Sequence, residues 1–255
     1  DFEEVNAMKK ILIIILSAVV LFSCAKKTVL KESSVGEEEL YNKAFEQYEA
    51  KKWGKSIDLF QKYIFSYPAN KRTESAQFYL ADAFFSAKSY TEAIVELEYF
   101  LDNYKNYNFK KDASYKLAIC YYKLAPSYQF DQTLSKNAIS VMREFLKDYP
   151  ESDNRQEIDS LSRILISRLE EKKMHTGNFY SKKRDYISAE IYYLSVDMNN
   201  ISSSYREKLL ISLSDVQMKL KKYDDAQKNL KKIGESSKNY PKAVKMLDAI
   251  EKKLK

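Results

Sequence analysis

The sequence predicts an all-α protein built from repeated pairs of helices. Only 4 Gly and 4 Pro occur among its 255 residues, which are too few turn formers for a β-rich fold. Small residues recur at a spacing of 37 positions, from Ala44 to Ala81 to Ala118 and again from Gly177 to Ser214. Amphipathic segments surround these positions, as expected for helices that bury one face. A regular array of helical hairpins is therefore predicted.

Residues 1–23 predict a signal peptide. Met8-Lys9-Lys10 is a short positive start, and the apolar run 11–23 has 13 residues, fewer than the roughly 20 that a membrane-spanning helix needs. The first seven residues include three acidic ones, which do not suit the start of such a signal. We therefore expect translation to begin at Met8.

The segment Leu21-Phe22-Ser23-Cys24 resembles a bacterial lipobox, with Leu three residues before the cysteine and a small residue directly before it. The resemblance implies that Cys24 begins the mature chain and carries a covalent lipid. Two or more acyl chains, at about 0.8 kcal/mol per buried CH₂, would hold the protein on a bilayer. Phe22 departs from the small residue usual at its place, so a plain cleaved signal with an incidental cysteine is the alternative. Ala25, by the sorting rule of similar lipoproteins, favours the outer membrane.

The segment 24–38 is predicted to be a flexible tether because it has little apolar content. Helical periodicity begins at Glu39. We divide the rest into 39–152, which holds three repeats, and 153–255, which holds an extra helix, two further repeats and a capping helix.

Each repeat contains a second small residue. It lies twelve positions after the first at Ser56, Ala93, Ala189 and Ala226, and twenty after Ala118 at Ala138. An aromatic residue stands three positions earlier in most repeats, at Trp53, Tyr90, Tyr186 and Tyr223. This spacing resembles the tetratricopeptide repeat (TPR), in which small residues let the two helices of a hairpin approach closely. The predicted fold is a TPR solenoid of about five helix-turn-helix repeats with a C-terminal capping helix.

Two irregularities interrupt the array. The segment 125–135 adds about eight residues between the helices of the third repeat, and 153–172 forms an extra long helix before the fourth. Together with Tyr67-Pro68 and Tyr149-Pro150, which close repeats, these features resemble the BamD family of lipoproteins. The resemblance covers 24–150 well and the remainder only as repeats.

The family resemblance implies a function. It implies a scaffold of the machinery that assembles outer-membrane β-barrel proteins, lipid-anchored at the cell outer membrane and facing the periplasm. Its implied partners are a BamA-like barrel subunit, other subunits of the assembly machine, and unfolded outer-membrane proteins. The alternative is another periplasm-facing TPR lipoprotein that organises cell-envelope or peptidoglycan enzymes.

Catalysis is not predicted. His175 is the only histidine, so a Ser-His-Asp or Cys-His site has few ways to form, and there is neither a His/Cys cluster with metal-ligand spacing nor a Gly-rich phosphate loop. We expect no enzyme and no cofactor apart from the covalent lipid on Cys24. Cys120 is expected to be a small buried hydrophobe.

The net charge of +7 is concentrated at the C-terminal end. From Arg206 to Lys255 there are 14 Lys and Arg against 7 Asp and Glu. No stretch combines clustered Arg with Gly and stacking aromatics, so a nucleic-acid partner is not expected. We predict a partner-docking surface here, for which simple solvation is the alternative; its residues are Lys221, Lys222, Lys228, Lys231 and Lys232.

The first helix of each repeat is expected to line a concave groove. Counting by helix phase from the small residues places seven rings there in repeats one to three: Tyr41, Phe45, Tyr48, Phe78, Phe85, Tyr115 and Tyr122. The equivalent positions in the last two repeats are Met174, Asn178, Ser181, Ile211, Asp215 and Met218. We predict that the aromatic half binds extended peptides. The alternative is that the rings pack between neighbouring first helices.

Overall fold

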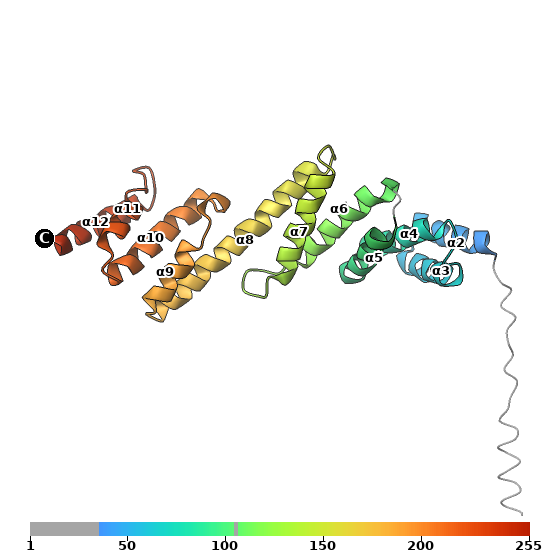
Figure 1. Ribbon diagram of the computed structural model, residues 1–255, viewed down its shortest axis with the longest axis horizontal. Helices are drawn as coiled ribbons and strands as arrows, with labels where there is room; N and C mark the ends of the chain where they lie inside the picture. Colours follow the sequence, from blue (N-terminus) through green and yellow to red (C-terminus); the bar gives the residue numbers. More distant parts are fainter. Residues whose placement is uncertain (1–35, 105–106) are drawn as a thin grey trace, which may run out of the picture. The chain divides into compact units, whose positions relative to one another are not determined.

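The computed structural model describes residues 36–104 and 107–255, and within these residues the secondary structure is entirely helical (Figure 1). The predicted signal peptide and Cys24 lie outside the described residues. None of the described helices is long and apolar enough to cross a membrane. The α-helices are α2 (Glu37–Glu49), α3 (Trp53–Ser66), α4 (Thr73–Ser86), α5 (Tyr90–Asn103), α6 (Tyr107–Leu124), α7 (Thr133–Asp148), α8 (Arg155–Lys182), α9 (Tyr186–Leu194), α10 (Ser203–Lys219), α11 (Tyr223–Leu230) and α12 (Tyr240–Leu254).

The helices form an array of successive pairs. From α3 to α12 each α-helix packs against the next one along the chain. The first helices of successive repeats, α4, α6, α8 and α10, and then α12, also contact one another in that order. A row of first helices in mutual contact, with second helices packed beside it, is the arrangement of a TPR array. The predicted fold class is confirmed.

Small residues occupy every helix crossing that the sequence predicted. Ala44, Ala81, Ala118, Ser214, Ser56, Ala93, Ala138, Ala189 and Ala226 are all 0% exposed. Ser56 Oγ donates to the carbonyl of Ala44 at 3.2 Å, so a short side chain of one helix reaches the backbone of the other in the first repeat. The fourth crossing has no room for a larger residue than Gly, because a Cβ atom at Gly177 would lie 2.6 Å from the ring of Tyr193.

Four of the five first helices end in the same tight turn. Lys51, Lys88, Arg184 and Lys221 have φ of 56°, 63°, 62° and 62°, respectively, which is the left-handed region. In each case the following N–H donates to the carbonyl five residues earlier, as from Lys52 to Gln47 and from Ser89 to Phe84. This is the Schellman ending, which Gly usually occupies and which here is built with basic residues.

The third repeat replaces this turn with a longer loop, 125–132. The buried side chain of Gln132 closes the loop by donating to the carbonyls of Ser127 at 2.9 Å and Phe130 at 3.0 Å. The loop packs on α8, where the ring of Tyr128 stacks on that of His175 with 4.2 Å between centroids. Lys172 Nζ also donates to the carbonyl of Phe130 at 2.6 Å, so the two irregularities of the sequence contact each other.

The extra helix is not a separate element. Residues 155–182 form one continuous helix of 28 residues, α8, which contains both the segment expected as an extra helix and the first helix of the fourth repeat. No Gly or Pro stands between residues 155 and 176 to end the helix earlier. The loop of the third repeat contacts α8 at Lys172 and His175, where the two parts of the helix join.

Candidate functional site

Three of the predicted groove rings lie on α2. Tyr41, Phe45 and Tyr48 are half-buried and follow one another along the helix, with centroid distances of 6.4 Å and 6.0 Å between neighbours. Tyr79 on α4 closes this row, because its ring meets those of Phe45 at 5.0 Å and Tyr48 at 5.1 Å edge to face. Tyr79 was not among the predicted residues. Its place two residues before Ala81, facing the preceding repeat, is the signal that could have identified it.

The two predicted rings on α4 differ. Phe78 is only 4% exposed and stacks on Phe109 at 4.4 Å within the hydrophobic core. It is therefore a core residue, because the first helix of the next repeat covers it. Phe85 is half-buried and meets Tyr90 edge to face at 6.2 Å.

The two predicted rings on α6 contact charged side chains of α8. The hydroxyl of Tyr115 donates to Glu157 at 3.0 Å, and burial together with this carboxylate raises the pKa of Tyr115 to about 12. The guanidinium of Arg168 lies 5.8 Å from the centroid of Tyr122. Both rings are half-buried. Six of the seven predicted rings thus keep part of their surface accessible, while the rest of each ring packs against neighbouring helices.

A charge cluster with a largely buried ion pair lies beside the aromatic rings and was not predicted. The ammonium of Lys116 on α6 is 3.0 Å from Asp82 on α4 and 2.5 Å from Asp112. The hydroxyl of Tyr48 on α2 donates to the same Asp82 carboxylate. Burial is the main cause that raises the pKa of Tyr48, and this hydrogen bond is the second. The Lys116 ammonium also lies 5.0 Å from the ring centroid of Phe78. The cluster connects the first helices of three successive repeats.

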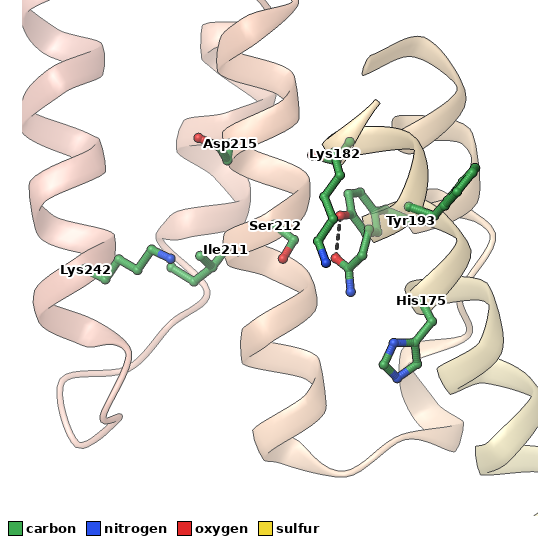
Figure 2. A pocket seen from close by; sticks show the side chains of 10 residues that line it. His175, Lys182, Tyr193, Ile211, Ser212, Asp215 and Lys242 are labelled. Atoms are coloured by element: carbon green, nitrogen blue, oxygen red, sulfur yellow. Dashed lines mark hydrogen bonds between the residues drawn. The ribbon is translucent and has the colours of Figure 1, made fainter. Parts of the chain in front are cut away.

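The groove positions of the last two repeats contain an open pocket of about 550 Å³ (Figure 2). Four of the positions counted by helix phase line it, namely Asn178, Ser181, Ile211 and Asp215, whereas Met174 is buried in the core at 6% exposure. The full lining is His175, Asn178, Phe179, Ser181, Lys182, Tyr193, Ile211, Ser212, Asp215 and Lys242.

Hydrogen-bond donors predominate in this pocket. The buried hydroxyl of Tyr193 donates to Asn178 Oδ1 at 2.7 Å, as Figure 2 shows, and burial is the main cause that raises the pKa of Tyr193. Lys182 and Ser212 extend toward the space between α8 and α10. Asp215 is the one carboxylate among the lining residues. Two lysines, Lys182 and Lys242, line the pocket with this carboxylate, in contrast to the aromatic surface of the first repeats.

The five predicted docking lysines are exposed, but two of them have structural partners. Lys222 Nζ lies 2.5 Å from the carboxylate of Glu190, whose side chain is 8% exposed, and Lys232 Nζ donates to Asn229 Oδ1 at 3.1 Å. Lys221 occupies the left-handed turn before α11. Lys228 and Lys231 are exposed and belong to neither of these contacts. They are consequently the better candidates for a partner contact.

The described residues offer no catalytic or metal centre. No group of three or more His, Cys, Asp or Glu among them could hold a metal ion. Cys120 is buried, and burial raises the pKa of its thiol to about 12, which keeps it protonated and unreactive. The predicted lipid site, Cys24, lies outside the described residues.

Comparison with known proteins gives the family. Residues 34–233 match the family model YfiO, described as outer membrane lipoprotein. The chain belongs to this family. It is 22% identical over 200 residues to the outer membrane protein assembly factor BamD of Caulobacter vibrioides, covering 77% of this chain and 64% of that protein. It is 26% identical over 187 residues to BamD of Rickettsia prowazekii, covering 72% of this chain and 74% of that protein.

These matches confirm the predicted BamD-family membership. The chain spans less than two thirds of the Caulobacter protein. Both relatives are named as assembly factors, which agrees with the prediction of a protein without enzymatic activity. Among solved structures, the TPR domain of P58(IPK) aligns with a TM-score of 0.41 and 14% identity, over 86% of this chain and 65% of that one. The helix packing and the family membership show the fold.

Proposed function

We propose that this protein is a lipoprotein subunit of the machinery that assembles β-barrel proteins in the outer membrane. The observation that carries the proposal is the family match over residues 34–233, which includes nearly all of the helical array. The two BamD relatives support it, because each is named as an outer membrane protein assembly factor. The protein would act by binding, since a TPR array presents extended surfaces to other proteins.

Two separate surfaces would bind two different partners. The half-buried rings of repeats one to three, among them Phe85 and Tyr122, would contact unfolded outer-membrane protein segments. Such segments alternate apolar and polar residues and therefore present an apolar side chain at every second position. The basic C-terminal end, with Lys228 and Lys231, would dock an acidic face of a BamA-like barrel subunit.

The two contacts should respond differently to salt. Phe85→Leu with Tyr122→Leu is expected to weaken binding of an aromatic-rich peptide from an outer-membrane barrel protein, and added salt should change this binding little because apolar burial is not screened. Lys228→Glu with Lys231→Glu is expected to reduce copurification of the barrel subunit in mild detergent. That contact should also weaken in salt, since exposed charges are screened over about 8–10 Å at physiological ionic strength.

Each pair of substitutions serves as the control for the other. Peptide affinity that survives the two ring substitutions would exclude the aromatic surface. Unchanged copurification of the charge-reversed protein would exclude the basic end. If the wild-type chain brings down no barrel-assembly subunit at all, the proposed function itself is wrong.

The membrane anchor would be a lipid on Cys24. Cys24→Ser is expected to abolish labelling by an alkyne fatty acid and to leave the protein in the periplasm or as uncleaved precursor, because the acyl chains supply the membrane affinity. Cys120→Ser is the matched control and should be labelled like the wild type. Equal labelling of the Cys24→Ser protein would refute the anchor.

A further inference from the structure

The helix α9 turns three large aliphatic side chains to solvent. Ile187, Ile191 and Leu194 are 65%, 61% and 61% exposed, respectively. Their spacing of four and then three residues places them on one face of the helix. The opposite face buries Ala189 and Tyr193, and Glu190, beside the stripe, is only 6% exposed. The helix therefore packs inward through Ala189 and Tyr193 and leaves a second, aliphatic face in solvent.

Specific contacts hold α9 in this orientation. The Glu190 carboxylate accepts from Lys222 Nζ at 2.5 Å and from Gln217 Nε2 at 3.4 Å. Asp185 caps the start of the helix by accepting from the N–H of Ser188 at 3.1 Å. Rotating α9 to bury its aliphatic face would remove Glu190 from both partners. The exposed aliphatic face is thus a consequence of the native packing and does not depend on a loosely placed helix.

The other repeats show that the fold does not require aliphatic residues at these positions. The three residues lie two before, two after and five after the buried small residue of the second helix. The corresponding exposed residues are Gly54, Asp58 and Gln61 in the first repeat, Thr91, Val95 and Glu98 in the second, Lys136, Ser140 and Arg143 in the third, and Asp224, Lys228 and Lys231 in the fifth. Val95 is the single aliphatic residue among these twelve. The stripe on α9 is consequently a specific feature of the fourth repeat.

Basic residues border the aliphatic stripe. Lys182, Lys183 and Arg184 are exposed in the segment that leads into α9. The second helices of the neighbouring repeats are α7 and α11. At the outward positions compared above, α7 carries two basic residues and no acidic one, and α11 carries two basic residues and one acidic one. An apolar stripe within a predominantly basic surface is complementary to an apolar stripe flanked by carboxylates.

We propose that Ile187, Ile191 and Leu194 form a docking stripe for an amphipathic helix of a partner protein that carries acidic residues beside its apolar face. Three apolar residues along one helix face match the i, i+3, i+4 pattern of such a helix. A second copy of this chain would bring like charges together. A bilayer would need a broader apolar plane, whereas the outward positions of the adjacent repeats are polar or charged. The stripe goes beyond the proposed function and does not depend on it.

The test uses the full chain in mild detergent and a fluorescently labelled synthetic helix of about five turns, with Leu along one face and Glu on both sides of it. We expect Ile191→Ser with Leu194→Ser to weaken binding at least about tenfold, which corresponds to about 1.4 kcal/mol. Val95→Ser is the matched control, because Val95 has the same position in the second repeat and the same exposure of 61%; it should bind like the wild type. Replacing Glu by Lys in the peptide should weaken binding to a similar extent.

Three results would overturn the proposal. The first is equal affinity of the peptide for all variants. The second is concentration-dependent self-association of the wild type that Ile191→Ser abolishes, which would assign the stripe to a second copy. The third is that the wild type binds vesicles containing phosphatidylglycerol and the Ile191→Ser protein does not, although the Ile191→Ser protein still binds the peptide. Circular dichroism checks that each variant remains folded, and loss of copurification with a barrel subunit is a separate readout that bears on the proposed function alone.

Discussion

Replacing Gly177 by Ala should destabilise the protein by about 2–3 kcal/mol, the cost of forcing extra volume into a packed crossing. The new Cβ atom would lie 2.6 Å from two ring atoms of Tyr193. That ring cannot move aside easily, because it is 1% exposed and its hydroxyl is bound to Asn178. The clash outweighs the roughly 1 kcal/mol that Ala gains over Gly in a helix interior. The midpoint of urea unfolding measures the difference.

Gly54 supplies the matched control. It also lies in a helix, α3, but nothing stands within 4 Å of the position that a Cβ atom would take. Gly54→Ala should therefore raise stability by about 0.5–1 kcal/mol through helix propensity alone. If Gly177→Ala were as stable as Gly54→Ala, the assignment of Gly177 to a tight helix crossing would be incorrect.

Replacing Lys116 by Met should cost about 3–4 kcal/mol, in the range found when one partner of a buried ion pair is removed. The side chains of Lys116 and Asp82 are 13% and 9% exposed, so Asp82 would be left charged, buried and without its cation. The hydroxyl of Tyr48 would remain as its hydrogen-bond donor. Urea unfolding should show a lower midpoint. The double variant Lys116→Met with Asp82→Asn should recover part of the loss, because it removes the uncompensated charge.

Arg163→Met provides the control for a solvent-exposed pair. Arg163 and Asp159 also form an ion pair, at 2.9 Å, but their side chains are 78% and 44% exposed. The expected loss is below about 0.5 kcal/mol, since water and salt screen such a pair. A Lys116→Met protein that loses no more stability than Arg163→Met would mean that the buried cluster does not connect the first three repeats energetically.

The sequence by itself determined the repeat architecture and the helix crossings. Two helices of a hairpin can approach closely only where both side chains are small. Small residues therefore recur every 37 positions, as from Ala44 to Ala81 and from Gly177 to Ser214, and this spacing can be read without knowledge of any contact. The family features were accessible for a similar reason. The loop 125–132 and the long α8 appear as departures from an otherwise regular pattern.

The tertiary structure alone decided which groove residues are accessible and which charges are paired. Helix phase gives the direction of a side chain, but its burial depends on what the neighbouring repeat places opposite it. Phe78 therefore lies in the core beneath Phe109, although it shares a helix with the half-buried Phe85. For the same reason, Lys222 forms an ion pair with Glu190 of the preceding repeat.

Contacts between segments far apart in the chain could not be predicted from the sequence either. Tyr128 and His175 stand 47 positions apart, and only the packing of the third-repeat loop on α8 brings their rings together. The outward face of α9 follows the same rule. Its aliphatic spacing is visible in the sequence and would normally indicate a buried face, but α9 packs through Ala189 and Tyr193 on its opposite side, which leaves the aliphatic face in solvent.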